Sequence, residues 1–123
     1  MSKSTNGYFN ALLPQNSDKW QVVEGTDNLV EFYTLSEDKN GDYTRLTRFR
    51  EGADTTAFGA IHHLYPEEVF IVSGRMYDAS VDQWLETGDY ASRPPLEPHG
   101  PFMSDVDCVV LEMSYPSQSI QQA

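Results

Sequence analysis

The sequence has few of the features that define several broad classes of protein. Its 123 residues include one cysteine, Cys108, which excludes an intramolecular disulfide and therefore a disulfide-stapled secreted scaffold. Because Cys108 opens an apolar run, we expect its thiol to be buried and inert. The apolar runs are only a few residues long, and residues 1–10 contain neither the apolar segment nor the cleavage site of a signal peptide. We therefore expect a cytoplasmic protein with no membrane span.

Basic residues are also scarce. Eight lysines and arginines stand against nineteen aspartates and glutamates, which gives a formal net charge of -11 at pH 7. Such a charge repels polyanions, so sequence-independent binding to nucleic acid is not expected. An acidic surface is compatible with binding a cation.

Helical periodicity is absent, and the length and the hydrophobic content of 39% fit one compact domain. We divide the chain into an N-terminal arm at residues 1–19, a folded domain at 20–116 and a C-terminal tail at 117–123. The arm carries one apolar patch, from Tyr8 to Leu13, that is too short to fold alone. We expect this patch either to dock on the domain or to cross to a second subunit of a homodimer.

Turn residues recur about every ten residues from Trp20 onward and separate short runs of β-branched and aromatic residues. This pattern is typical of an all-β sandwich or barrel. Asn40-Gly41 supports one of the hairpins, because this pair tolerates the positive φ angles of a type I′ turn. Strands are predicted at residues 20–24, 29–35, 43–50, 67–73, 75–79, 83–85, 90–93 and 108–115.

The predicted strand at 67–73 carries an informative carboxylate. Strand alternation places Glu67 on the same face as Val69 and Ile71. The opposite face, which includes Phe70, is also partly apolar, so we expect packing on both sides. An unpaired carboxylate that faces a core costs several kcal/mol or loses its charge, so Glu67 needs a cation nearby.

The three histidines, His62, His63 and His99, fall in two places, each beside turn residues. A fold that brings both places together with Glu67 offers imidazole nitrogens and one carboxylate oxygen. This set suits Fe(II), Mn(II), Ni(II), Co(II), Cu(II) or Zn(II). The single cysteine argues against a thiolate site, and the imidazoles argue against Mg or Ca. The spacing leaves a second interpretation open, in which exposed loop histidines only flank turns.

Two segments resemble the two sequence motifs of the cupin family. Residues 59–74 are similar to the first motif, in which a pair of histidines precedes a glutamate, six further residues and a glycine. Glu67 and Gly74 have that spacing. Residues 88–103 are similar to the second motif, and its matching positions are Gly88, Pro94 and His99. The resemblance implies a small single-domain cupin of the RmlC-like superfamily, with an all-β jelly-roll fold and the N-terminal arm outside it.

The resemblance also implies that His62, His63, Glu67 and His99 are metal ligands, with one or two positions left for water or substrate. His63 takes the second histidine position of the motif, whereas His62 is displaced by one residue. On a regular strand His62 would point away from His63. A bulge or loop within residues 52–62 would turn His62 back inward.

Cupins include dioxygenases, isomerases and noncatalytic ligand-sensing domains, so the resemblance does not select a reaction. We expect one divalent transition metal, with Mn(II) or Fe(II) favoured over Ni(II) or Zn(II). The first hypothesis is a small metal-dependent enzyme of dioxygenase or isomerase type that acts on an oxygenated small molecule. Glu67 would be its anionic ligand, and Tyr65 is a candidate for proton transfer. The second hypothesis is a noncatalytic cupin that binds or senses a metal or small ligand.

Three arginines share the predicted strand at 43–50. Arg48 and Arg50 lie on one face of this strand, where they could clamp an anionic substrate. The alternative is a solvated strand face.

The resemblance also implies a homodimer, whose two subunits would pair through sheet edges and exchange their N-terminal arms.

Overall fold

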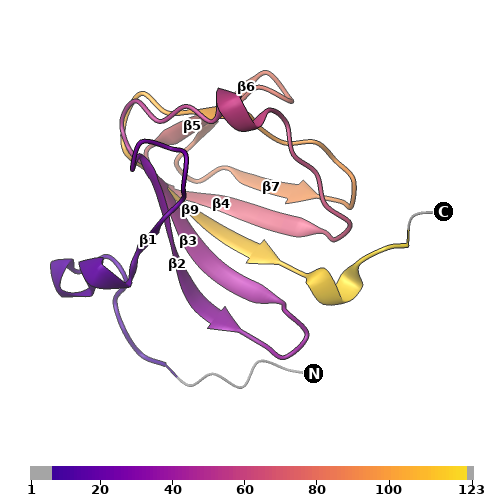
Figure 1. Ribbon diagram of the computed structural model, residues 1–123, viewed down its shortest axis with the longest axis horizontal. Helices are drawn as coiled ribbons and strands as arrows, with labels where there is room; N and C mark the ends of the chain where they lie inside the picture. Colours follow the sequence, from indigo (N-terminus) through magenta and orange to yellow (C-terminus); the bar gives the residue numbers. More distant parts are fainter. Residues whose placement is uncertain (1–6, 122–123) are drawn as a thin grey trace.

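The computed structural model describes residues 7–121 and contains two antiparallel β-sheets with short 3-10 helices (Figure 1). The larger sheet has the strand order β1-β2-β3-β9-β4-β7, and the smaller has the order β6-β5-β8. The strands are β1 (Gln21–Val22), β2 (Val30–Glu37), β3 (Tyr43–Phe49), β4 (Glu67–Ser73), β5 (Arg75–Asp78), β6 (Gln83–Glu86), β7 (Tyr90–Arg93), β8 (Phe102–Met103) and β9 (Cys108–Ser114). The 3-10 helices are η1 (Pro14–Lys19), η2 (Thr56–Phe58) and η3 (Pro116–Gln118).

The all-β prediction is confirmed, and every predicted strand has a counterpart in the structure. The first is shorter than predicted, since β1 covers only Gln21–Val22. Strand β8 is absent from the prediction, because its two residues are too few to show alternation. The division into arm, domain and tail stays a prediction, and residues 1–6 and 122–123 lie outside the described residues.

The main hydrophobic core lies between the two sheets. Alternation along the strands of the large sheet turns every second side chain toward the small sheet. There they pack with residues of β5 and β6. The buried members of this core are Val30, Phe49, Ala53, Val69, Ile71, Met76, Leu85, Cys108 and Val110.

Strand β4 is buried on one face only. Val69 and Ile71 lie in the core as predicted, and Glu67 shares their face. Phe70 and Val72 on the opposite face are 40% and 37% exposed, so the expectation of packing on both sides is wrong. An antiparallel sheet can leave one face in solvent, and β4 does so.

The arm docks on its own domain, over the outer face of the large sheet. Ala11 and Trp20 form a second buried cluster with Leu46 and Val109. The indole Nε1 of Trp20 donates to the Ala11 carbonyl oxygen at 3.2 Å. Ala11 of the apolar patch therefore docks on the domain, and a crossing of the arm to a second subunit stays a prediction.

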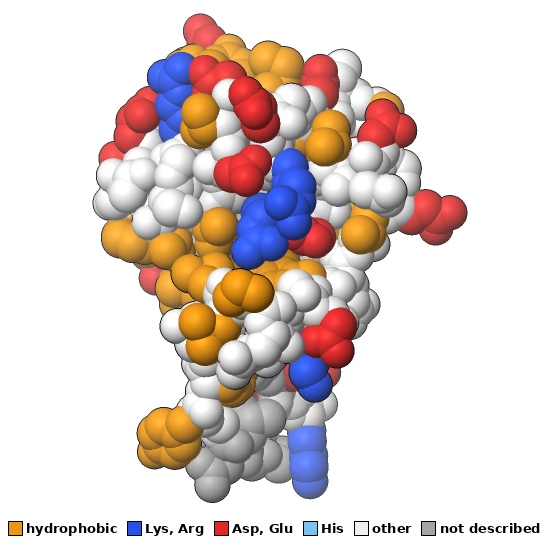
Figure 2. Space-filling view, turned by 90° about the vertical axis from the view of Figure 1, so that its left-hand side faces the viewer, with side chains coloured by type: hydrophobic (Ala, Val, Ile, Leu, Met, Phe, Trp, Pro, Cys, Tyr) orange, Lys and Arg blue, Asp and Glu red, His pale blue; other side chains and the backbone are white. Residues whose placement is uncertain are grey.

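Part of the same patch is nevertheless in solvent. Figure 2 shows hydrophobic side chains gathered in the lower half of this side of the molecule. The exposed residues of the patch are Tyr8, Phe9, Leu12 and Leu13. Among the described residues, no helix has the length and apolar character needed to cross a membrane.

A single residue, Gly74, carries the chain from the large sheet to the small one. Strand β4 ends at Ser73 and β5 begins at Arg75. Gly74 has a φ of 73°, and a Cβ at this position would overlap the carbonyl oxygen of Asp107. Glycine is therefore required at this corner.

Cys108, the first residue of β9, is fully buried, and burial raises the pKa of its thiol to about 12. A thiol with a raised pKa stays protonated at mildly alkaline pH, and the protonated form does not attack electrophiles. We expect iodoacetamide to leave the folded protein unmodified at about pH 8. After unfolding in urea, intact mass spectrometry should detect one adduct per chain. Equally fast labelling of the folded protein would contradict this burial.

Candidate metal centre

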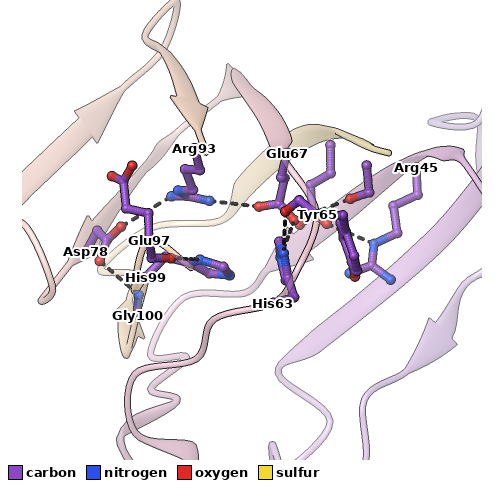
Figure 3. Close-up of polar contacts among 11 residues, drawn as sticks. Arg45, His63, Tyr65, Glu67, Asp78, Arg93, Glu97, His99 and Gly100 are labelled. Atoms are coloured by element: carbon purple, nitrogen blue, oxygen red, sulfur yellow. Dashed lines mark hydrogen bonds and ion pairs between the residues drawn. The ribbon is translucent and has the colours of Figure 1, made fainter. Parts of the chain in front are cut away.

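Three side chains, from two segments that are distant in the sequence, meet on the wall of one cavity (Figure 3). His63 lies in the loop before β4, Glu67 is the first residue of β4, and His99 lies in the loop before β8. A backbone bridge joins the two loops, because Ile61 and His99 exchange two hydrogen bonds of 2.9 Å each. This bridge brings the two sequence motifs together.

The potential ligand atoms of these three residues all lie within 4.8 Å of one another. Nε2 of His63 is 3.3 Å from Oε2 of Glu67. Glu67 and His99 are 6% and 4% exposed, and His63 is half-buried. Two imidazoles and one carboxylate at this spacing can hold one transition-metal ion and leave coordination positions open.

Backbone carbonyl groups orient both imidazoles for this task. Nδ1 of His63 is 2.9 Å from the carbonyl oxygen of Tyr65, and Nδ1 of His99 is 3.4 Å from that of Glu97. When Nδ1 carries the proton and donates to a carbonyl, Nε2 keeps a lone pair for a metal. Burial is the largest of the causes that lower the pKa of His99 below its usual value, and this favours the neutral ring. The residues present therefore fit a divalent ion.

Arg93, the last residue of β7, is the cation partner that Glu67 requires. Strand β7 pairs with β4 and places Arg93 directly opposite Glu67. Nη1 of Arg93 donates to Glu67 Oε1 at 3.0 Å, and Ser114 Oγ donates to Oε2 at 3.3 Å. Because Arg93 occupies Oε1, the oxygen that faces His63 is Oε2.

Asp78, the last residue of β5, holds the other end of this network. Its Oδ2 accepts a hydrogen bond from Nη2 of Arg93 at 3.2 Å, and its Oδ1 accepts one from the Gly100 N–H at 2.9 Å. Asp78 is 2% exposed, so its charge depends on these partners. One buried aspartate thus connects the residue after His99 to the arginine that holds Glu67. The sequence alone identifies neither Asp78 nor Arg93. It indicates only that Glu67 needs a cation nearby.

The cavity has a volume of about 680 Å³ and is lined by residues of both sheets. This volume is in the range of small-molecule sites. Tyr65 lies on its wall and stacks on His63, with ring centroids 4.0 Å apart and an interplanar angle of 7°. Burial, helped by the neighbouring Tyr43, raises the pKa of Tyr65 to about 12, so its hydroxyl is neutral near pH 7. Apolar side chains complete much of the wall, among them Phe49, Val69 and Phe102.

The structure does not bring His62 into the group of ligand atoms. His62 is exposed, and it is not among the residues that line the cavity. Residues 52–62 do contain an irregular segment with η2, but that segment leaves His62 outside. A ligand role for His62 stays a prediction from the resemblance.

The arginines of β3 are arranged differently from the predicted clamp. Arg48 and Arg50 both donate to Oε1 of Glu31, at 2.7 Å each. It is Arg45, on the other face of the strand, that lines the cavity. Alternation shows which residues share a face, but it does not show which face is inside.

A sequence profile of the ChrR cupin-like domain family matches residues 11–117 of the chain. Among curated proteins, endo-1,4-beta-xylanase B of Cellvibrio japonicus is 32% identical over 88 residues, which make up 72% of this chain and 14% of that protein. The chain therefore corresponds to a small part of that relative.

Many solved structures share this fold, some of them over more than nine-tenths of the chain. An RmlC-like cupin from Shewanella frigidimarina has a TM-score of 0.69 at 17% identity, over 94% of this chain and 95% of that one. An acetylacetone dioxygenase from Acinetobacter johnsonii has a TM-score of 0.69 at 13% identity, over 92% of this chain and 76% of that one. At these identities the likeness shows the fold, a cupin β-sandwich.

Proposed function

The chain belongs to the ChrR cupin-like domain family, and we propose that it is a small metal-dependent enzyme that acts on an oxygenated small molecule. The observation that carries this proposal is the group of His63, Glu67 and His99 on the wall of a cavity large enough for a substrate. Two histidines and one carboxylate leave positions at a metal open for substrate. The dioxygenase with the same fold supports the choice of substrate class.

Mn(II) or Fe(II) is the ion that we favour, with Ni(II) or Zn(II) as the other choices. Such an ion polarises a carbonyl or enediol and, in the case of iron, supports chemistry with dioxygen. Within the chain, Glu67 supplies the anionic donor, and His63 and His99 supply neutral ones. The Tyr65 hydroxyl, on the wall of the same cavity, can donate a proton to a substrate oxygen.

Turnover by metal-loaded protein tests this proposal. A panel of one diketone, one enediol, one hydroxyaromatic compound and one ketose is incubated with Fe(II)- or Mn(II)-loaded protein, and oxygen uptake and product formation are measured. We expect turnover of at least one compound. We also expect Tyr65→Phe to lower kcat by about 100-fold while metal affinity is unchanged. Tyr77→Phe serves as the control, because Tyr77 is a half-buried tyrosine that does not line the cavity.

A noncatalytic binding or sensor cupin is the second candidate. It is favoured by the lack of an obvious general base, because Oε1 of Glu67 accepts a hydrogen bond from Arg93 and its Oε2 faces His63 as a ligand atom. Stoichiometric metal with no turnover of any compound in the panel would support this candidate over the enzyme.

We further propose that the protein forms a homodimer through its arm. The support is the group of exposed apolar side chains on the arm, which includes Tyr8 and Leu12. Deletion of residues 1–18 tests this proposal. If the number of chains per particle in solution stays the same after the deletion, the proposal is wrong.

A further inference from the structure

We propose that the cavity binds a small organic monoanion whose carboxylate is held by Arg45 and Thr47 while another oxygen of the same molecule reaches the metal centre. This inference rests on the proposed function, because it names the substrate class of the same site. The observations behind it are independent of the three ligand residues.

Arg45 is held in a fixed orientation on the cavity wall. Its guanidinium Cζ lies over the rings of Phe32 and Tyr43, 5.1 and 5.0 Å from their centroids. Its Nε donates to Oε2 of Glu112 at 2.8 Å. Within the described part of the chain, that bond uses the Nε–H and leaves the Nη groups for a ligand. Two Nη donors of a fixed guanidinium match the two oxygens of a carboxylate.

Thr47, the next inward-facing residue of β3, has an unsatisfied hydroxyl. It is 5% exposed and lines the same cavity. Among the described residues, its Oγ1 has no hydrogen-bond partner. Buried hydroxyls are rarely left in this state, and a carboxylate oxygen at Arg45 would accept a hydrogen bond from it. Because Arg45 and Thr47 are two residues apart on one strand, both side chains project from the same face.

The strand register places Arg45 nearer to the metal centre than Thr47. Strand β9 lies between β3 and β4, and Ser114 is opposite both Tyr43 and Glu67. Arg45 is therefore one inward-facing position from the level of Glu67, and Thr47 is two. At about 4.8 Å per strand, β3 and β4 are about 10 Å apart, and their inward side chains converge on one cavity. Figure 3 shows Arg45 and Glu67 on either side of Tyr65. A molecule that carries a carboxylate a few carbons from a carbonyl spans such a gap.

The charge around the cavity also favours an anion. Buried or half-buried Arg45 and Arg93 stand against the carboxylates of Glu67, Asp78 and Glu112, so this group has one net negative charge. Glu24 also lines the cavity, but its side chain is exposed and water screens its charge. A divalent ion at the centre changes this to one net positive charge. A monoanionic ligand neutralises it, whereas a neutral ligand leaves a positive charge in a partly desolvated space.

Binding of matched acids and esters tests the inference without any turnover. The probes are acetoacetate, 4-oxopentanoate and 5-oxohexanoate, each with its methyl ester, titrated calorimetrically into Co(II)-loaded and metal-free protein. We expect at least one acid to bind about tenfold more tightly than its ester to loaded wild type. This preference should disappear in Arg45→Met, persist in part in Arg45→Lys, and persist fully in Arg48→Met, whose arginine lies on the outer face.

The outcomes separate this inference from the proposed function. Equal affinity for every acid and its ester overturns the role of Arg45, and so does an acid preference that survives in Arg45→Met. Circular dichroism of each variant confirms folding before titration, and Arg45→Lys keeps the test valid if Arg45→Met does not fold. If Co(II) does not bind at all, the proposed function fails, and the metal-free titration still shows whether Arg45 selects the acid.

Discussion

Arg93→Met lowers the free energy of unfolding of the metal-free protein by about 3 to 5 kcal/mol, because it leaves two buried carboxylates without their cation. The side chains of Arg93, Glu67 and Asp78 are 7%, 8% and 2% exposed, so solvent cannot replace the lost partner. Urea unfolding in the presence of a chelator measures the effect. With an ordinary urea dependence, the midpoint should fall by roughly 2 M.

Arg75→Met is the matched control, since Arg75 also pairs with two carboxylates, but at the surface. We expect a much smaller change, because exposed ion pairs are screened by water. Arg93→Lys should fall between the two, since it keeps the charge but loses the second hydrogen bond. A midpoint in Arg93→Met equal to that of Arg75→Met would show that the buried network contributes nothing to stability.

His63→Ala weakens metal binding by about 100-fold or more, while His62→Ala leaves it unchanged. Loss of a group that only orients a ligand costs about 10- to 100-fold in affinity, so loss of the ligand itself costs at least the upper end. Competition titration with a chromophoric chelator measures the affinity of each variant for Mn(II) or Zn(II). The pair is well matched, because the two histidines are adjacent in the sequence and differ in whether they face Glu67.

Equal losses in the two variants would restore the four-ligand set that the cupin resemblance implies. In that case the loop before β4 would have to rearrange on metal binding, so that His62 turns toward the cavity. An unchanged affinity in both would remove His63 from the site.

Much of the fold could be predicted from the sequence because it depends on local patterns. Alternating apolar residues mark strands, and pairs such as Asn40-Gly41 mark the turns between them. Strand β8 could not be predicted in this way, because two residues carry no period. The exposure of the outer face of β4 could not be predicted for another reason: Phe70 is apolar, but composition does not show whether another layer covers it.

The site also has a part that could be predicted from the sequence and a part that could not. The spacing of the two motifs indicates Glu67, His63 and His99, because each motif is a short continuous segment of the chain. Arg93 and Asp78 depend on which strands pair and in what register, and no local pattern shows this. Arg45 illustrates the same limit, since a sequence shows three arginines on one strand but not which face lines the cavity.

The central claim is that His63, Glu67 and His99 hold one divalent metal ion. Elemental analysis of untagged protein from defined medium, alongside His99→Ala, tests it most directly. We predict close to one transition-metal ion per chain in the wild type and less than about a tenth of that in the variant. A wild type without stoichiometric metal, or a variant with the same metal content, would contradict it.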